Sequence, residues 1–182
     1  DFCLSRGLGD VYKRQIYDWP EKEGFVQAHS ITRKNPLPEI WDRYGRMNGS
    51  NFADVPKNGK YNYSQRAIPY YDNPEAYHIG RFNNKTYFDK IDAIRDNDIK
   101  KLNEILKQEN VKTIDVNEFA EMKKGYQGFI SKIGEEMPNV DATYGLRGKA
   151  APMGDMEGGA NQFLTPLSGS ILEKLGILTE GI

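Results

Sequence analysis

The sequence contains little cysteine and little histidine, with one cysteine and two histidines among its 182 residues. The single cysteine, Cys3, excludes an internal disulfide and a cysteine-rich metal site. His29 and His78 are too few to form a histidine-based metal site. We therefore expect no metal centre, and any catalysis would run without a protein-bound transition metal.

Neither sign of charge dominates the chain, and long hydrophobic runs are missing. The 25 basic and 26 acidic residues give a net charge of −1, so no overall positive field exists to hold a nucleic acid backbone. No run approaches the length of a transmembrane helix, and the amino terminus lacks the basic region and apolar segment of a secretion signal. We expect neither a nucleic acid partner nor membrane insertion by this domain.

Residues 1–15 have no clear hydrophobic period and resemble translated sequencing-adaptor read-through joined to a genuine domain. We expect this stretch to be a non-native or disordered leader, and we leave it out of fold reasoning. Residues 16–182 have the length of one domain with a single core.

Apolar and polar residues alternate in several short segments, and this alternation predicts strands. The segment 39–43 runs into Gly45, where the chain can turn sharply, and 25–31 alternates weakly. Residues 77–82 alternate cleanly and predict a strand with Tyr77 and His78 on opposite sides. The segment that begins at residue 61 also starts with a period of two.

Residues 88–140 differ in character and predict a helical insertion or lid. Isoleucine and leucine recur there at intervals of three to five among charged residues, which fits two short amphipathic helices with Asp96 or Asp98 as a cap between them. Asp115 and Glu118 form a capping-box variant that opens a third helix. Ser168 or Ser170 can cap a closing helix. We predict an α+β fold: a small, curved, mostly antiparallel sheet with a helical insertion and a C-terminal helix.

The polar residues suited to chemistry stand singly, at strand ends or beside glycine: Arg43, Arg66, His78 and Gln162. Two arginines suit a diphosphate, because each guanidinium is a planar fork of donors. A histidine can orient a ligand or exchange protons, and a glutamine can bind a sugar hydroxyl or a water. The plainer alternative pairs Arg43 with Asp42 on a solvated surface. The glycine-rich stretch 145–159 lacks the spacing of known phosphate-binding loops.

The ordered motifs of the chain resemble those of the TNT domain family, the NAD(P)+ glycohydrolase toxin domains named for the tuberculosis necrotizing toxin. The resemblance covers residues 17–84 and 145–182. Its pieces are Trp19-Pro20 with Gly24-Phe25, Asp42-Arg43-Tyr44-Gly45 with Gly49, Gln65-Arg66-Ala67-Ile68-Pro69, Tyr77-His78, and Ala151-Pro152 followed by Gly158-Gly159-Ala160-Asn161-Gln162-Phe163.

The resemblance implies an NAD site lined by Arg43, Arg66, His78 and Gln162. Arg43 and Arg66 would bind phosphate, His78 would orient the diphosphate or ribose, and Gln162 would serve the nicotinamide-side ribose or the water. Asn51 stands where relatives carry an aromatic residue, and the adjacent Phe52 could stack on the substrate in its place.

Two further departures concern the loops of the domain. The stretch 155–160 lacks the proline and the third glycine usual in the family, and the helical block is longer. Oxocarbenium-like centres are often stabilised by carboxylates, and Glu157 is the nearest candidate to Gln162 in sequence, although a solvent-facing acid is the simpler interpretation.

The activity implied by the resemblance is hydrolysis of the nicotinamide–ribose bond of NAD+ or NADP+, with the dinucleotide as substrate and no cofactor. The implied setting is a secreted effector that acts in the cytosol of a target cell during bacterial competition, with a cognate immunity protein as partner. The alternatives are an ADP-ribosyltransferase, or a non-catalytic domain that binds a nucleotide or a protein.

Overall fold

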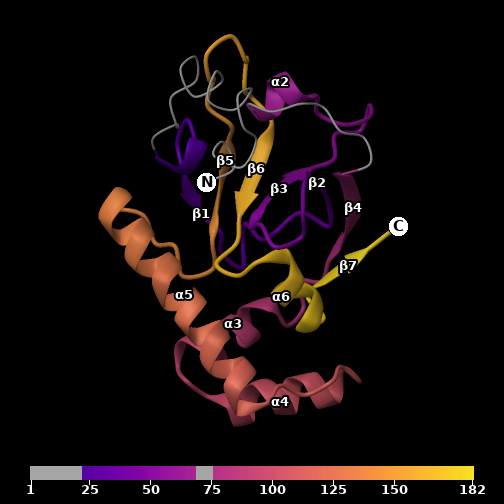
Figure 1. Cartoon of the computed structure of the whole chain (residues 1–182), viewed down its shortest axis with the longest axis vertical. Coiled ribbons are helices and arrows are strands. Elements are labelled where there is room, and N and C mark those ends of the chain that lie inside the picture. Colours follow the sequence, from indigo (N-terminus) through magenta and orange to yellow (C-terminus); the bar gives the residue numbers. More distant parts are fainter. Residues whose placement is uncertain (1–21, 69–75) are drawn as a thin grey trace, which may run out of the picture.

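The computed structural model describes residues 22–68 and 76–182, and a single open sheet of seven strands organises them (Figure 1). The strand order is β1-β5-β6-β3-β2-β4-β7, and every neighbouring pair is antiparallel. The strands are β1 (His29–Ser30), β2 (Ile40–Tyr44), β3 (Asn51–Asp54), β4 (Tyr77–Phe82), β5 (Leu146–Lys149), β6 (Asn161–Leu164) and β7 (Leu178–Glu180). With the helices described below, this sheet confirms the predicted α+β class.

The two faces of the sheet follow from the strand register, since cross-strand partners point to the same side. Asp42 pairs with Ala53, and Ala53 pairs with Gln162, so these residues share one side, named here the Gln162 face. The opposite side is named the Trp41 face. On it, the Trp41 ring lies edge-on to Phe52, with ring centroids 5.3 Å apart, and Phe82 packs against both.

Three consecutive helices occupy the block where a helical insertion was predicted: α3 (Tyr87–Arg95), α4 (Ile99–Gln108) and α5 (Val116–Glu136). The cap of α4 is Asp98, whose side chain accepts a hydrogen bond from the backbone N–H of Lys101. The predicted capping box opens α5, because Asp115 accepts from the Glu118 backbone while the Glu118 side chain accepts from the Asp115 backbone. These caps satisfy backbone donors that the first turn leaves unpaired.

The helical block shares the hydrophobic core of the sheet. Buried side chains of α3, including Tyr87 and Ile91, belong to the same cluster as Trp41. In α5, Ile133 instead packs with Leu146 and Leu164 of the sheet in a second cluster. Figure 1 shows α3, α4 and α5 gathered at one end of the sheet, away from α2.

A buried lysine joins α3 to the C-terminal helix α6 (Gly169–Lys174). The Nζ of Lys90 donates to the carbonyl of Leu175 at 2.7 Å and forms a 2.5 Å ion pair with Glu109, which follows α4. Ser168 caps α6 by accepting from the backbone N–H of Ile171. No helix in the described ranges is both long and apolar enough to cross a membrane.

The strand-like period predicted from residue 61 onward is wrong, because the short helix α2 (Tyr63–Arg66) forms there. Asn62 and Gln65 make a reciprocal capping box, with Asn62 accepting from the Gln65 backbone and Gln65 accepting from the Asn62 backbone. A cap that satisfies two backbone donors outweighs an alternation of only three residues. Strands β3, β5 and β7 were not predicted, and the remaining short element is the 3-10 helix η2 (Lys22–Gly24).

Candidate functional site

A buried ion pair lies at the centre of the Gln162 face. The carboxylate of Asp42 is fully buried and accepts a hydrogen bond of 2.8 Å from Nη2 of Arg66, whose side chain is only 6% exposed. The hydroxyl of Tyr77 also donates to Asp42 at 2.8 Å. Asp42 was predicted as a surface partner of Arg43, and that alternative is wrong, because neighbouring residues of a strand point to opposite faces.

Further contacts fix the Arg66 guanidinium in place. Its Nε donates to the carbonyl of Tyr61 at 2.8 Å, and its central carbon lies 4.9 Å from the centre of the Tyr44 ring. Within residues 22–68 and 76–182, its third nitrogen, Nη1, has no hydrogen-bond partner. The guanidinium is therefore held rigidly while one donor group stays available for an anion.

The loop before β6 holds α2 in position through backbone hydrogen bonds. Gly158 donates to the carbonyl of Ser64 at 2.9 Å, and Ala160 donates to the carbonyl of Gln65 at 3.0 Å. Gly158 has a φ of +69°, and a Cβ at this position would lie 2.5 Å from the carbonyl oxygen of Ala150. Glycine is therefore required at position 158, and Gly158 has a structural role in holding α2 against the loop.

Gln162 lies on the same face as the ion pair, at the end of the cross-strand row that contains Ala53 and Asp42. Two strand spacings separate its backbone from that of Asp42, which corresponds to about 10 Å. Its Nε2 donates to the carbonyl of Gly24 at 2.9 Å. Its Oε1 accepts no hydrogen bond from the residues that the structure describes, so the fixed amide presents an acceptor.

Three tyrosines surround the Arg66–Asp42 pair and give this face flat, apolar surfaces. Tyr44 packs against Tyr63 and Tyr77, with ring centroids 4.5 Å and 5.0 Å away. Burial, together with the hydrogen bond to Asp42, raises the pKa of Tyr77 above its usual range. Tyr77 therefore stays a neutral donor at neutral pH, and Lys60 lies over its ring at 4.0 Å.

Arg43 points to the Trp41 face and holds the β2–β3 loop. Its Nε donates to the carbonyl of Arg46 at 2.9 Å, and its Nη1 donates to the carbonyl of Asn51 at 2.8 Å. A Cβ on Gly49 would lie 2.0 Å from the guanidinium, so the second glycine of this motif makes room for it. The spacing between Arg43 and Gly49 is therefore explained by the β2–β3 loop, which Arg43 holds and in which Gly49 leaves room for the guanidinium.

His78 and Phe52 also belong to the Trp41 face. His78 is the cross-strand partner of Arg43, and its Nδ1 lies 2.7 Å from Oε1 of Glu180 on β7. Phe52 is 2% exposed and forms part of the aromatic core. The structure thus brings together Arg66 and Gln162 of the predicted site residues, and it places Arg43, His78 and Phe52 on the other side of the sheet.

Sequence reasoning did not identify Asp42 and Tyr77 as residues of the site. The available signal was an acid directly after the apolar pair Ile40-Trp41 in a predicted strand, because a buried carboxylate requires a cation or several donors.

Several other predicted features add little to the site. Glu157 is exposed on the loop that contacts Ser64. No cluster of three or more histidine, cysteine, aspartate or glutamate residues able to hold a metal occurs in the described part of the chain. The Trp19-Pro20 motif lies outside the described residues.

Comparison with known proteins adds no relative: no protein-family model matches the chain, and no curated protein matches it.

Proposed function

We propose that the chain is a TNT-like NAD(P)+ glycohydrolase that hydrolyses the nicotinamide–ribose bond to give nicotinamide and ADP-ribose. The observation that supports this proposal is the juxtaposition of the buried Arg66–Asp42 pair with Gln162 on one sheet face. The ordered motif resemblance supplies the reaction class. In the same proposal the domain is a secreted effector for the cytosol of a target cell, and an immunity protein is its partner.

The mechanism relies on positioning and electrostatics. Nicotinamide leaves as a neutral ring, so no acid has to protonate it. The requirement is to hold the diphosphate and ribose while positive charge develops on the sugar, and then to admit water. Arg66 binds the diphosphate through its available Nη1, and Asp42 fixes the guanidinium in the orientation that this contact needs.

Gln162 acts at the reacting end of the substrate. Its amide nitrogen is held by the Gly24 carbonyl, so its Oε1 is oriented to accept a hydrogen bond from a ribose hydroxyl or from the attacking water. The tyrosines of this face, rather than Phe52, provide the aromatic contact with the substrate. Arg43 and His78 are assigned to holding the loop and the sheet edge.

The direct test is to incubate the purified protein with NAD+ or NADP+ and to follow nicotinamide release by chromatography. Gln162→Ala should lower the rate by about a hundredfold, on the scale of losing one preorganised hydrogen-bonding group. Gln127→Ala, an exposed glutamine on α5, is the matched control and should keep the wild-type rate. Circular dichroism spectra of both variants verify that they are folded.

The other outcomes separate the alternatives. A folded wild type that releases no nicotinamide, or a Gln162→Ala variant at full rate, contradicts the proposal. Label from ADP-ribose retained on a co-incubated protein identifies a transferase. Stoichiometric dinucleotide binding without consumption identifies a binding domain.

A further inference from the structure

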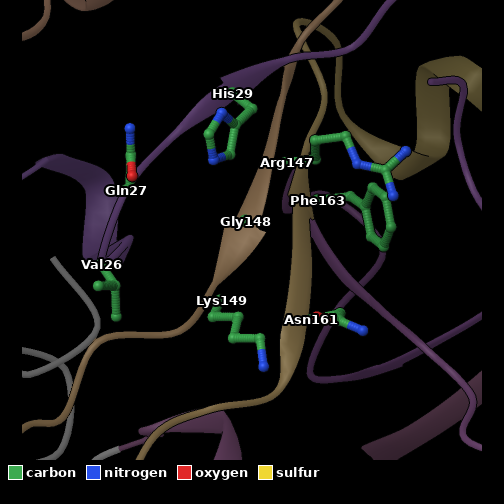
Figure 2. Close-up of a pocket in the computed structure, with 8 residues that line it drawn as sticks. All are labelled: Val26, Gln27, His29, Arg147, Gly148, Lys149, Asn161 and Phe163. Carbon is green, nitrogen blue, oxygen red and sulfur yellow. The ribbon is translucent and has the colours of Figure 1, made fainter. Parts of the chain in front are cut away.

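A cavity of about 400 Å³ lies between β1, β5 and β6, on the opposite side of the sheet from Gln162 (Figure 2). It is lined by His29 of β1, by Arg147, Gly148 and Lys149 of β5, by Asn161 and Phe163 of β6, and by the chain just before β1. His29 pairs with Arg147, and Lys149 pairs with Asn161, so these four side chains share the Trp41 face. The volume suits a ligand up to about the size of a mononucleotide.

A β-bulge shapes one wall of this cavity. His29 pairs with Arg147 and Phe25 pairs with Ala150, so the three residues 26–28 oppose the two residues 148–149. At the bulge the chain runs close to β5. A Cβ on Gly148 would lie only 2.4 Å from the carbonyl oxygen of Gln27. Bulges commonly re-aim side chains beside binding sites, and here the bulge carries Val26 and Gln27 to the cavity.

The cavity lining is cationic. Arg147 and Lys149 contribute two positive charges, and none of the residues that line the cavity is an acid. The carboxylate that contacts the lining is Asp54, which accepts a hydrogen bond of 3.2 Å from the amide of Asn161. That contact orients the amide of Asn161.

Arg147 is half-buried, yet it has no carboxylate partner among the residues that the structure describes. Its Nη1 donates to the carbonyl of Pro36 at 2.8 Å, and its guanidinium lies 5.1 Å from the centre of the Phe163 ring. Figure 2 shows the Arg147 side chain beside that ring. By contrast, Arg66 and Arg81 both pair with carboxylates. A partly desolvated cation without a counter-charge favours binding of an anion.

We propose that this cavity binds a small molecule that carries a phosphate group. Arg147, Lys149 and His29 donate hydrogen bonds to that phosphate. The three side chains come from two neighbouring strands and share one face of the sheet. A phosphate group has three acceptor oxygens and more than one negative charge, so it matches three donors better than a carboxylate does. The neutral amides of Gln27 and Asn161 contact the rest of the ligand. This inference does not depend on the proposed glycohydrolase activity.

The test is a titration of the whole chain, followed by heteronuclear NMR, with inorganic phosphate, phenyl phosphate and benzoate as separate probes. The expected result is saturable shifts confined to residues 26–29, 147–149 and 161–163. Phenyl phosphate should bind at least tenfold more tightly than benzoate. Equal affinity for benzoate would overturn the assignment of a phosphate ligand.

Matched substitutions complete the test. Arg147→Gln and Lys149→Gln should each weaken phenyl phosphate binding at least fivefold, and Lys100→Gln, which removes the same charge from an exposed site on α4, should leave it unchanged. Lys149 is exposed, so its variant is expected to fold even if Arg147→Gln does not. Equal weakening by Lys100→Gln, or shifts confined to residues around Arg66 and Asp42, would rule out this site while leaving the proposed activity untouched.

Discussion

The guanidinium of Arg66, on the one-turn helix α2, donates a 2.8 Å hydrogen bond to the fully buried carboxylate of Asp42 on strand β2. The pair holds α2 against the sheet. The hydroxyl of Tyr77 donates a second hydrogen bond to the same carboxylate oxygen of Asp42. A charge with so little access to water depends strongly on its partner.

Removal of the Arg66 cation should therefore be costly. We expect Arg66→Gln to lower the free energy of unfolding by about 3–5 kcal/mol, because it leaves the Asp42 carboxylate buried without a counter-ion. Arg81→Gln is the matched control: its ion pair with Glu39 is exposed, so its loss should cost about 1 kcal/mol or less. Urea denaturation of both variants measures the difference, and equal losses would show that burial of the Arg66 pair has no energetic role.

Gly49→Ala should disrupt the β2–β3 loop. The new methyl group would overlap the Arg43 guanidinium, which must then leave its two carbonyl acceptors. We expect a loss of about 1–3 kcal/mol in the free energy of unfolding, typical of overpacking. In an Arg43→Ala background the methyl group of Gly49→Ala meets no guanidinium. The loss of unfolding free energy caused by Gly49→Ala should therefore be smaller there. An undiminished effect there would contradict the proposed steric cause.

Stability should fall in acid partly through Glu109. Burial alone would raise the pKa of this carboxyl, but hydrogen bonds from Lys90 and Thr86 outweigh burial and lower the pKa below its ordinary value. Its contribution is complete above the ordinary pKa of about 4.5 and disappears as pH falls through the folded-state pKa. Unfolding free energies measured from pH 7 to pH 3 should therefore decline less steeply for Glu109→Gln than for wild type. Glu104→Gln, an exposed change on α4, should follow the wild-type slope.

Two glycines should respond oppositely to alanine. Gly128 lies inside α5 with open space at its Cβ position, so Gly128→Ala should stabilise the protein by about 0.5–1 kcal/mol. Gly158 has a positive φ and a carbonyl in the way of a Cβ, so Gly158→Ala should destabilise it by more than that amount. Thermal unfolding of the two variants provides the comparison. A stabilising Gly158→Ala would show that the loop before β6 has room to relax.

The elements with a local signal were predictable from the sequence. Helices α3, α4 and α5 have apolar periods, α4 and α5 also have capping residues at their starts, and β4 contains clean alternation. Strands β5 and β7 are three or four residues long, and they exist because of partners far away in the chain. No local period marks such segments, since their stabilisation comes from pairing rather than from propensity.

The site was predictable only in part, for a geometric reason. Alternation alone showed that Tyr77 and His78 diverge, but it could not say which of them shares a face with Gln162. That relation requires the registers of β2 with β3 and of β3 with β6, which place Asp42 and Gln162 in one row. The convergence predicted for Arg43, Arg66, His78 and Gln162 is found for Arg66 and Gln162 alone.

The sheet joins segments from distant parts of the chain, since Ser30 pairs with Leu146 and Gly80 pairs with Glu180. Contacts of such long sequence separation are slow to form, whereas α3, α4 and α5 follow one another and meet through short loops. Until β7 pairs with it, the outer edge of β4 therefore stays unpaired as the chain folds. We therefore expect pairing of the two outer strands, β1 and β7, to limit the rate of folding.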